Sequence, residues 1–346
     1  MKEVYKILTD LKPKIDNHIA TVLPKKGDPQ ILFDGCWAYF EYGGKRFRPA
    51  LMALACEALG GKTDDTIPAG AALEIAHNFF LIHDDIEDGS EMRRGKPALH
   101  KQYGEDHAIN MGDYLMMKVY DSILTGSDLW GKEKTFKILM QFTQMLERTG
   151  EGQAFEMDQR DKDLSEATLH WYKKMSMHKT GYYTGGTPCE IGAIIADGTP
   201  NQIKSLKDFG LAVGVAFQIQ DDVIDLTMKE EDENVAPGTS GGGHGKKFAE
   251  DLKEGKRTLI VVHAFDKASD EDKDILRKLI GKDDITHEEK LQTIEIFKKY
   301  GSIEFAKKYA RELLETALKE MRQVIPESEG RRKLESVATF LIEREF

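Results

Sequence analysis

The feature that most constrains the fold is an acidic motif that follows an apolar helical stretch. Its first copy, Asp84-Asp85-x-x-Asp88, comes after the apolar run 71–82, which contains neither proline nor glycine. Such a run predicts one continuous helix. Residues four apart stack on one helix face, so Asp84 and Asp88 would bring two like charges together. Ionised carboxylates on a largely apolar helix require compensation by positive charge.

The motif occurs a second time with the same spacing, as Asp221-Asp222-x-x-Asp225 after the apolar stretch 211–217. One acidic cluster by itself is most often a solvated helix end. Two copies that each close an apolar helix predict instead two facing helices that hold metal ions between them. Oxygen ligands in small number favour Mg²⁺, which keeps several waters and shares the phosphate oxygens of a substrate. The expected ligand is therefore strongly anionic, and a diphosphate fits.

The remaining sequence predicts an all-α protein. Long stretches of helical periodicity alternate with short Gly or Pro breaks, and strands with period-two alternation are nearly absent. A chain of 346 residues with 40% hydrophobic content can bury one large core. We expect residues 1–346 to form a single large helical bundle domain with a central cavity. The stretch 1–23 is amphipathic, and Pro13 is expected to kink or restart its helix.

One segment departs from this pattern. Residues 228–247 hold an acidic run followed by a glycine string, a composition that cannot form a packed helix. It is predicted to be a mobile loop directly after the second acidic motif. A lid and an inert surface insertion are both compatible with it.

Composition limits the partners and the compartment. The net charge of −11 disfavours nonspecific nucleic-acid binding, so basic residues must act as local clusters. The three cysteines Cys36, Cys56 and Cys189 are scattered and lack metal-ligand spacing, which indicates reduced core thiols in a cytoplasmic protein. The N-terminus does not resemble a signal peptide, and no apolar run approaches the length of a membrane span.

Several basic clusters complement the acidic motifs. The turn 43–49 combines glycines with Lys45, Arg46 and Arg48, and Arg93-Arg94 would lie about two helical turns beyond the first motif. Arginine forks and lysine point charges bind phosphate oxygens. No nucleophile arrangement, nucleotide-binding glycine loop or zinc spacing is visible. The pattern favours metal-assisted departure of diphosphate.

These motifs, in this order, resemble those of the trans-isoprenyl diphosphate synthases, also called polyprenyl synthetases. The resemblance runs from about Gly43 to the C-terminus. It rests on the turn 43–49, both acidic motifs, Arg93-Arg94, Gly112-Asp113, Gly152-Gln153, Lys179-Thr180 and Glu254-Gly255-Lys256. It implies a homodimeric, short-chain prenyltransferase that condenses isopentenyl diphosphate with dimethylallyl, geranyl or farnesyl diphosphate and uses Mg²⁺.

The resemblance also implies roles for individual residues. Metal binding would fall to Asp84, Asp88 and Asp221, supported by Asp85, Asp222 and Asp225. The allylic diphosphate would be gripped by Arg93, Lys179 and Lys256, with Lys246 nearby. The allylic cation would be stabilised by Thr180, Gln218 and Tyr183. Isopentenyl diphosphate would be bound by Lys45, Arg48, His77 and Arg94. The segment 245–251 lacks the proline and second glycine usual in the family, which leaves the role of Lys246 open.

Three positions before Asp84 carry further expectations. His77 precedes Asp84 by seven residues, on nearly the same helix face and about 10 Å away along the axis. A lone histidine on an apolar helix is commonly structural, but this position matches the family's contact to isopentenyl diphosphate. Phe79 and Phe80 would form a shallow floor, although phenylalanine is also common in cores. In the family, aromatics at these positions accompany short products, which favours farnesyl, then geranylgeranyl diphosphate.

Other functional classes are less compatible with the motifs. A terpene cyclase or a head-to-head synthase normally lacks the second acidic motif and the basic glycine turn. A non-catalytic regulatory subunit of a heteromeric synthase tends to lose aspartates from one motif. All six aspartates are present here.

Overall fold

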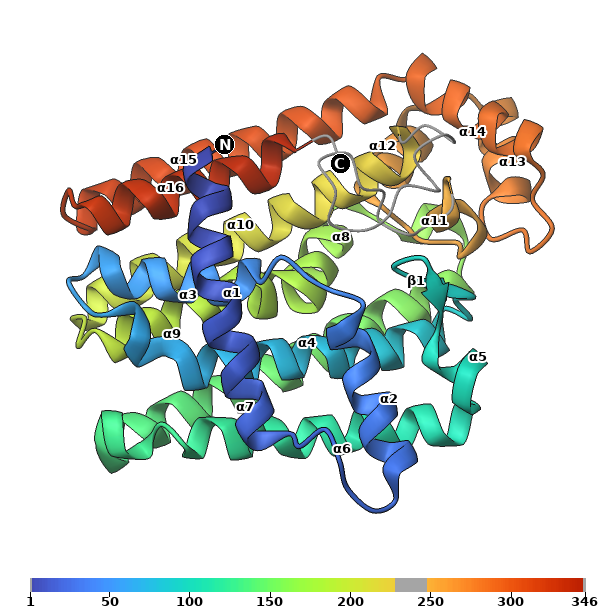
Figure 1. Cartoon of the computed structure of the whole chain (residues 1–346). Coiled ribbons are helices and arrows are strands. Elements are labelled where there is room, and N and C mark those ends of the chain that lie inside the picture. The colour runs from blue at the N-terminus through green and yellow to red at the C-terminus, as the bar shows by residue number, and fades with distance from the viewer. Residues whose placement is uncertain (1, 228–247, 345–346) are drawn as a thin grey trace.

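The computed structural model describes residues 2–227 and 248–344, which form a bundle of helices (Figure 1). The all-α class expected from the sequence is confirmed. The long helices are α1 (Lys2–Val22), α4 (Ile67–Glu87), α6 (Glu105–Leu124), α7 (Ser127–Arg160), α10 (Pro200–Thr227) and α15 (Ser302–Val324). The shorter helices are α2 (Gln30–Glu41), α3 (Phe47–Ala58), α5 (Leu99–Tyr103), α8 (Leu169–Ser176), α9 (Thr187–Ile195), α11 (Glu250–Lys253), α12 (Leu259–Lys267), α13 (Asp270–Leu279), α14 (His287–Lys299) and α16 (Glu329–Glu343).

A few short elements connect these helices. Two 3₁₀ turns, η1 (Thr63–Thr66) and η2 (Leu164–Glu166), lie before α4 and α8. A π-helix, η3 (Met177–Gly186), joins α8 to α9. The two-residue strands β1 (Met92–Arg93) and β2 (Lys96–Pro97) pair as an antiparallel hairpin. No helix within residues 2–227 and 248–344 has the length and apolarity needed to cross a membrane.

Helix α4 lies at the centre of the bundle. Figure 1 shows it between α6 and α7 on one side and α10, α15 and α16 on the other, with α1 crossing these helices steeply. Every residue from Pro68 to Asn78 is buried, as expected for a helix that is apolar all round. Burial becomes partial at Phe79 and Phe80, so the cavity can open only beside the C-terminal half of α4.

The helices α7 and α10 pack closely against η3. An ideal Cβ at Gly152 of α7 would lie only 2.0 Å from the backbone nitrogen of Lys179, and one at Gly210 of α10 only 2.1 Å from the carbonyl oxygen of Gly185. The backbones of α7 and α10 therefore touch η3 directly, and larger side chains would force them apart. This contact brings the functional side chains of η3 between the two acidic helices.

Two local expectations were wrong. The helix does not restart at Pro13: α1 continues through it as one element, with the buried stripe Val4, Leu8, Leu11, Ile15 and Ile19 on both sides of the proline. The glycine turn is confined to residues 43–46, and Arg48 already lies in the first turn of α3. Lys179 and Thr180 lie inside the π-helix η3, a form of helix that is frequent at functional sites.

The arginine pair after the first acidic motif is also not on a helix. Helix α4 ends at Glu87, and Gly89 adopts a left-handed φ of +64°. The amide of Ser90 donates to the carbonyl of Asp85 at 2.9 Å, which closes the helix end in the manner common for a C-terminal glycine. The chain then turns back into the β1–β2 hairpin, so Arg93 and Arg94 return to α4 instead of extending away from it.

Candidate active site

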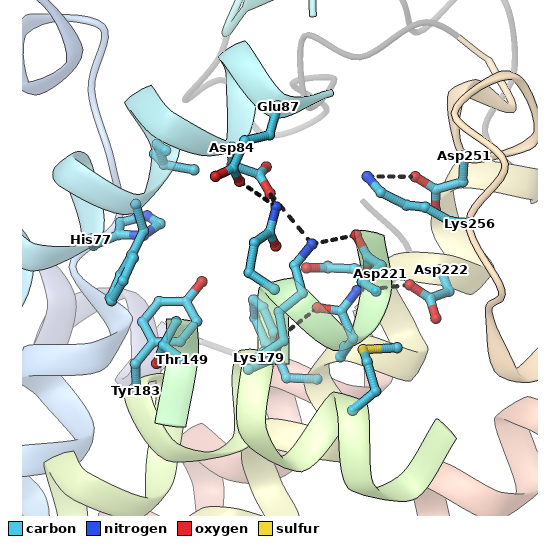
Figure 2. A pocket seen from close by; sticks show the side chains of 18 of the residues that line it. His77, Asp84, Glu87, Thr149, Lys179, Tyr183, Asp221, Asp222, Asp251 and Lys256 are labelled. Carbon is cyan, nitrogen blue, oxygen red and sulfur yellow. Dashed lines mark hydrogen bonds and ion pairs between the residues drawn. The ribbon is translucent and has the colours of Figure 1, made fainter. Parts of the chain in front are cut away.

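A cavity of about 500 Å³ lies where the C-terminal halves of α4 and α10 face each other. Figure 2 shows Asp84 and Glu87 on α4 opposite Asp221 and Asp222 on α10, with Lys179 of η3 reaching between them. The predicted site residues that line this cavity are Arg48, His77, Phe79, Phe80, Asp84, Arg93, Arg94, Lys179, Thr180, Tyr183, Gln218, Asp221, Asp222, Asp225 and Lys256. Most of the predicted constellation is therefore brought together by the fold.

The three aspartates of the first motif point in different directions. Asp84 lines the cavity, and Asp88 is held between Arg160 at 2.5 Å and Lys256 at 3.1 Å. Asp85 is fully buried on another side of the helix, where Nε of Arg93 donates to its two carboxylate oxygens at 2.9 and 3.1 Å. Asp85 does not line the cavity. It follows Asp84 by one residue and therefore lies on a different face of α4 from the one beside the cavity.

Asp88 has a buried side chain and, unlike Asp84, does not line the cavity, but nearby cations hold both carboxylates ionised. Burial by itself would raise the pKa of Asp84, but Lys179, Lys256 and Arg93 lower it below the usual range. Burial likewise opposes ionisation of Asp88, yet Lys256, Lys179 and Arg160 lower its pKa far below the ordinary value. Metal ligands must be deprotonated, and these two carboxylates meet that requirement.

The second motif divides in the same way. Asp222 is buried and accepts hydrogen bonds from Nε2 of Gln218 at 2.8 Å and from the hydroxyl of Tyr172 at 3.2 Å. Burial and the nearby Asp251 raise the pKa of Asp222 to about 7, against these hydrogen bonds. The oxygens of Asp225 accept the backbone amides of Glu250 and Asp251 at 3.2 and 3.4 Å, so Asp225 anchors the start of α11.

Asp221 is the more exposed member of the second motif, and Arg344 forms an ion pair with it. The guanidinium of Arg344 also lies over the ring of Phe217 at 4.1 Å and lines the cavity. Sequence reasoning missed Arg344, and no local pattern marks it, because only the packing of the C-terminal segment brings it to α10.

The cations of this region form one continuous network with the acids. Lys179 pairs with Glu156 at 2.6 Å and with Asp84 at 3.4 Å, and Glu156 also accepts from Arg160 at 2.9 Å. Burial favours the neutral form of Lys179, but Glu156 and Asp84 raise its pKa above the usual value. Lys256 contacts Asp88, Asp251 and Glu254, and its pKa is raised in the same way.

Glu156 is a second residue that sequence reasoning missed. A signal for it existed: Gln153, Glu156 and Arg160 follow each other at three- and four-residue spacing, which puts them on one face of α7. Gln153 donates to Glu87 at 2.6 Å and to Asp84 at 3.4 Å. This polar face of α7 therefore lies along the first acidic motif.

A second group of basic side chains lines the other side of the cavity. Arg48 donates to the hydroxyl of Tyr183 at 2.8 Å and lies 4.4 Å above its ring, and His77 stacks on the same ring with centroids 6.0 Å apart. Arg94 completes the group. Among the described residues, Nδ1 of His77 and Nε of Arg48 have no hydrogen-bond partner. We call Arg48, His77 and Arg94 the basic pocket; it is suited to an anion.

The fourth residue expected in this pocket is elsewhere. Lys45 is exposed, does not line the cavity, and places its ammonium 5.9 Å from the ring of Phe47. Its neighbour Arg46 is buried and pairs with Asp16 at 2.8 Å and Glu74 at 3.3 Å, so it fixes the turn to α1 and α4. Lys246 and the predicted loop 228–247 lie outside the described residues, and their roles stay predictions.

Polar and aromatic side chains lie between the two cation groups. The hydroxyl of Thr180 donates to Oε1 of Gln218 at 2.7 Å, which orients the amide of Gln218 toward Asp222. The rings of Phe79 and Phe80 lie 4.8 Å apart, and Phe80 meets the ring of Tyr183 edge-on at 5.4 Å. These rings form an apolar wall next to the charged groups.

The carboxylates fit Mg²⁺ on their donor chemistry. Within residues 2–227 and 248–344, no three acidic, histidine or cysteine side chains converge closely enough to bind a metal by themselves. Each acidic motif instead offers hard oxygen ligands to a shared space. Mg²⁺ is typically bound by one or two carboxylates together with water and substrate phosphates.

Comparison with known proteins agrees with the geometry. The family model for polyprenyl synthetases matches residues 29–297. The chain is 35% identical to the short chain isoprenyl diphosphate synthase of Methanothermobacter thermautotrophicus over the full length of both proteins. It is 33% identical to the geranylfarnesyl diphosphate synthase of Natronomonas pharaonis, over 92% of this chain and 91% of the relative. The crystal structure of geranylgeranyl pyrophosphate synthetase from Pyrococcus horikoshii superposes with a TM-score of 0.89 at 34% identity and covers 99% of each chain.

The basic pocket predicts a specific pH dependence of stability. Burial and the surrounding arginines lower the pKa of His77 well below its usual value. The unfolded chain therefore binds this proton first, and stability falls as the pH drops below about 6.5. Between pH 7.5 and 5.5, the unfolding free energy of the wild type should fall by about 1 kcal/mol more than that of His77→Gln, as measured by urea denaturation. His170→Gln, at an exposed histidine, should keep the wild-type dependence. Equal pH dependence of His77→Gln and the wild type would contradict the neutral state of His77.

Proposed function

The chain belongs to the polyprenyl synthetase family and is a trans-prenyltransferase, and on this premise we propose which residues of the cavity perform the condensation. The substrates are isopentenyl diphosphate and an allylic diphosphate. The observation that carries the proposal is the presence of two separate anion-binding regions in one cavity. Asp84, Lys179 and Lys256 mark the first, and the basic pocket is the second. Two diphosphate substrates require two such regions.

The allylic diphosphate binds beside the acidic motifs. Asp84, Asp88 and Asp221 would hold Mg²⁺, which when bound neutralises the diphosphate and makes it a better leaving group. Arg93, Lys179 and Lys256 then supply donors to the phosphate oxygens. Asp222 and Asp225 have supporting roles. Asp222 orients the amide of Gln218, and Asp225 anchors the start of α11 next to Lys256. These contacts stabilise the charge that develops on the departing diphosphate.

Isopentenyl diphosphate binds in the basic pocket through Arg48, His77 and Arg94. The carbon–oxygen bond of the allylic substrate breaks first, and the electron pair leaves with the diphosphate. The hydroxyl of Thr180, the amide oxygen of Gln218 and the ring of Tyr183 stabilise the resulting cation. The isopentenyl double bond then forms the new carbon–carbon bond, and the released diphosphate takes the proton. No side-chain base is required in this scheme.

The product belongs to the short-chain range, and we propose farnesyl or geranylgeranyl diphosphate. The allylic tail extends from Asp84 toward the apolar wall of Phe79 and Phe80. Two adjacent rings one helical turn below Asp84 limit the depth available to the tail. This wall favours farnesyl diphosphate, whereas relatives of similar identity carry the names geranylgeranyl and geranylfarnesyl synthase.

The proposal includes a homodimer built on α6 and α7. Large apolar side chains gather on these two helices with unusual exposure: Met117 is 53% exposed, Leu124 51%, Leu129 60%, Phe136 64% and Met140 54%. An apolar face of this kind on a charged protein marks an association surface. In a two-fold arrangement, the same face of each copy meets its counterpart on the other copy.

A cytoplasmic location is also part of the proposal. Cys36, Cys56 and Cys189 are free, buried thiols. Burial raises the pKa of each to about 12, so all three stay protonated and unreactive. Reduced structural thiols of this kind are typical of a reducing compartment.

Removal of metal or of a single ligand should abolish the condensation. Incubation with isopentenyl and geranyl diphosphate should give elongated product with Mg²⁺, none with excess EDTA, and product again on Mg²⁺ addition. Asp84→Asn should lower kcat on the order of 10³-fold, about 4 kcal/mol of transition-state stabilisation. Asp208→Asn, at an exposed ion pair of α10, should leave kcat unchanged. Failure of the wild type to elongate dimethylallyl, geranyl or farnesyl diphosphate would contradict the proposal and favour a regulatory subunit.

Shortening the apolar wall should lengthen the product. Phe80→Ala removes the ring that closes the cavity against Tyr183, so the tail gains space along α4. The main product should increase by one or more five-carbon units, as sized by chromatography of the dephosphorylated alcohols. Phe305→Ala, which removes a partly buried ring stacked on His263 outside the cavity, is the matched control and should not change the product. An unchanged product from Phe80→Ala would place the limit on another helix.

A charge on the exposed apolar face should dissociate the dimer. Wild-type protein is expected to show twice the monomer mass by light scattering during gel filtration. Phe136→Glu together with Met140→Glu should shift it to the monomer mass, because burying two unpaired carboxylates at an interface is unfavourable. Leu291→Glu on α14, also at an exposed apolar residue, should keep the dimer. A monomeric wild type would refute this part of the proposal.

A further inference from the structure

The two consecutive arginines Arg93 and Arg94 serve different regions of the cavity. Arg93 lies against the first acidic motif, with its guanidinium 3.7 Å from Oδ2 of Asp84. Arg94 lies with the basic pocket and lowers the pKa of His77. The backbone of Arg94 is left-handed, with a φ of +53°. A residue with a side chain holds such a conformation only where its surroundings fix it. The surroundings that fix this pair converge on one residue of α2, Tyr39.

The hydroxyl of Tyr39 controls the position of Arg93. Tyr39 is 1% exposed, and its hydroxyl donates to Oδ2 of Asp85 while accepting the backbone amide of Leu99 at 3.1 Å. Asp85 in turn accepts from Nε and from the terminal nitrogen of Arg93. A buried carboxylate keeps a fixed orientation when several donors share its oxygens. The orientation of the Arg93 guanidinium is thus set through Asp85 by the tyrosine.

The backbone of the same residue controls Arg94. The carbonyl of Tyr39 lies in the last turn of α2, where carbonyl groups lack helical partners. Arg94 donates to this carbonyl at 3.1 Å and also to the carbonyl of Gly43. A cation at the C-terminal end of a helix is favourable. Tyr39 therefore holds Arg93 through its side chain and Arg94 through its main chain.

We propose that Tyr39 is a positioning residue that directs Arg93 to the allylic diphosphate and Arg94 to isopentenyl diphosphate. The inference rests on the proposed function, because it requires two diphosphates in these two regions. It assigns Asp85 to the support of Arg93, which explains why the middle aspartate of the motif is buried away from the cavity. Removing only the hydroxyl of Tyr39 should loosen Arg93 and leave the anchor of Arg94 intact.

The test is Tyr39→Phe, which keeps the buried ring and deletes one oxygen. The KM for geranyl diphosphate should rise roughly ten- to hundred-fold, the range expected for one hydrogen bond to a charged group. The KM for isopentenyl diphosphate should stay within about twofold, because Arg94 keeps its carbonyl partners. An equal rise in both KM values, or no rise in either, would overturn the inference.

A mutant cycle separates positioning from a general structural effect. In an Arg93→Gln background, Tyr39→Phe should cause no further rise in the KM for geranyl diphosphate, because the residue through which the hydroxyl acts is gone. Additive effects of the two substitutions would overturn the inference. Asp85→Asn provides a second variant of similar shape and should reproduce the selective rise in the same KM. Thermal unfolding followed by circular dichroism verifies that each variant is folded.

The matched control is Tyr42→Phe. Tyr42 packs beside Tyr39 with ring centroids 5.5 Å apart, but its hydroxyl accepts a hydrogen bond from the exposed Gln102 at 2.5 Å, so both KM values should stay unchanged. Calorimetric titration of the wild type with inorganic diphosphate and Mg²⁺ gives an independent reading of anion binding. A wild type that neither binds diphosphate nor elongates a primer would overturn the proposed function itself. An active wild type with an unaffected Tyr39→Phe would overturn only the role of Tyr39.

Discussion

The structure around the cavity depends on one buried network of opposite charges. Glu156 on α7 pairs with Lys179 of η3 and Arg160, and these cations extend to Asp84 and Asp88 at the end of α4. Each charge would be very unfavourable without its partners, so the elements that carry them must stay together. Buried ion pairs add little net stability compared with an apolar core. Here they keep phosphate-binding cations and metal-binding acids charged in a site that excludes much of the solvent.

The balance of opposite charges also distinguishes the two proposed diphosphate-binding regions. Beside the acidic motifs, cations and carboxylates balance each other, and the pKa values of Asp84 and Asp88 are lowered. In the basic pocket, arginines dominate, and the pKa of Arg94 falls to about 10 through burial and the neighbouring arginines. The first region is suited to a diphosphate that arrives with metal ions. The second is suited to a diphosphate that supplies the missing negative charge by itself.

Support for the site also comes from residues that tie its surrounding segments together. Arg257 is buried and donates to the carbonyls of Gly255, Arg160 and Lys162, which ties the segment before α12 to the end of α7. Asp225 holds the start of α11 on the same side. Tyr39 and Asp85 hold Arg93, at the end of β1, through side-chain hydrogen bonds.

The sequence determined the all-α class, the two acidic helices, the basic turn and most of the cavity residues, because helical periodicity and the spacing of four are local properties of the chain. It placed Asp84 and Asp88 on one face of α4, but it could not show that Asp88 would be buried between Arg160 and Lys256 or that Asp85 would hold Arg93. Nor could it place Lys45 outside the site or Arg344 inside it, since these positions depend on how distant segments meet. The divergence of Arg93 and Arg94 was likewise decided by the tertiary structure, through a tyrosine more than fifty residues earlier in the chain.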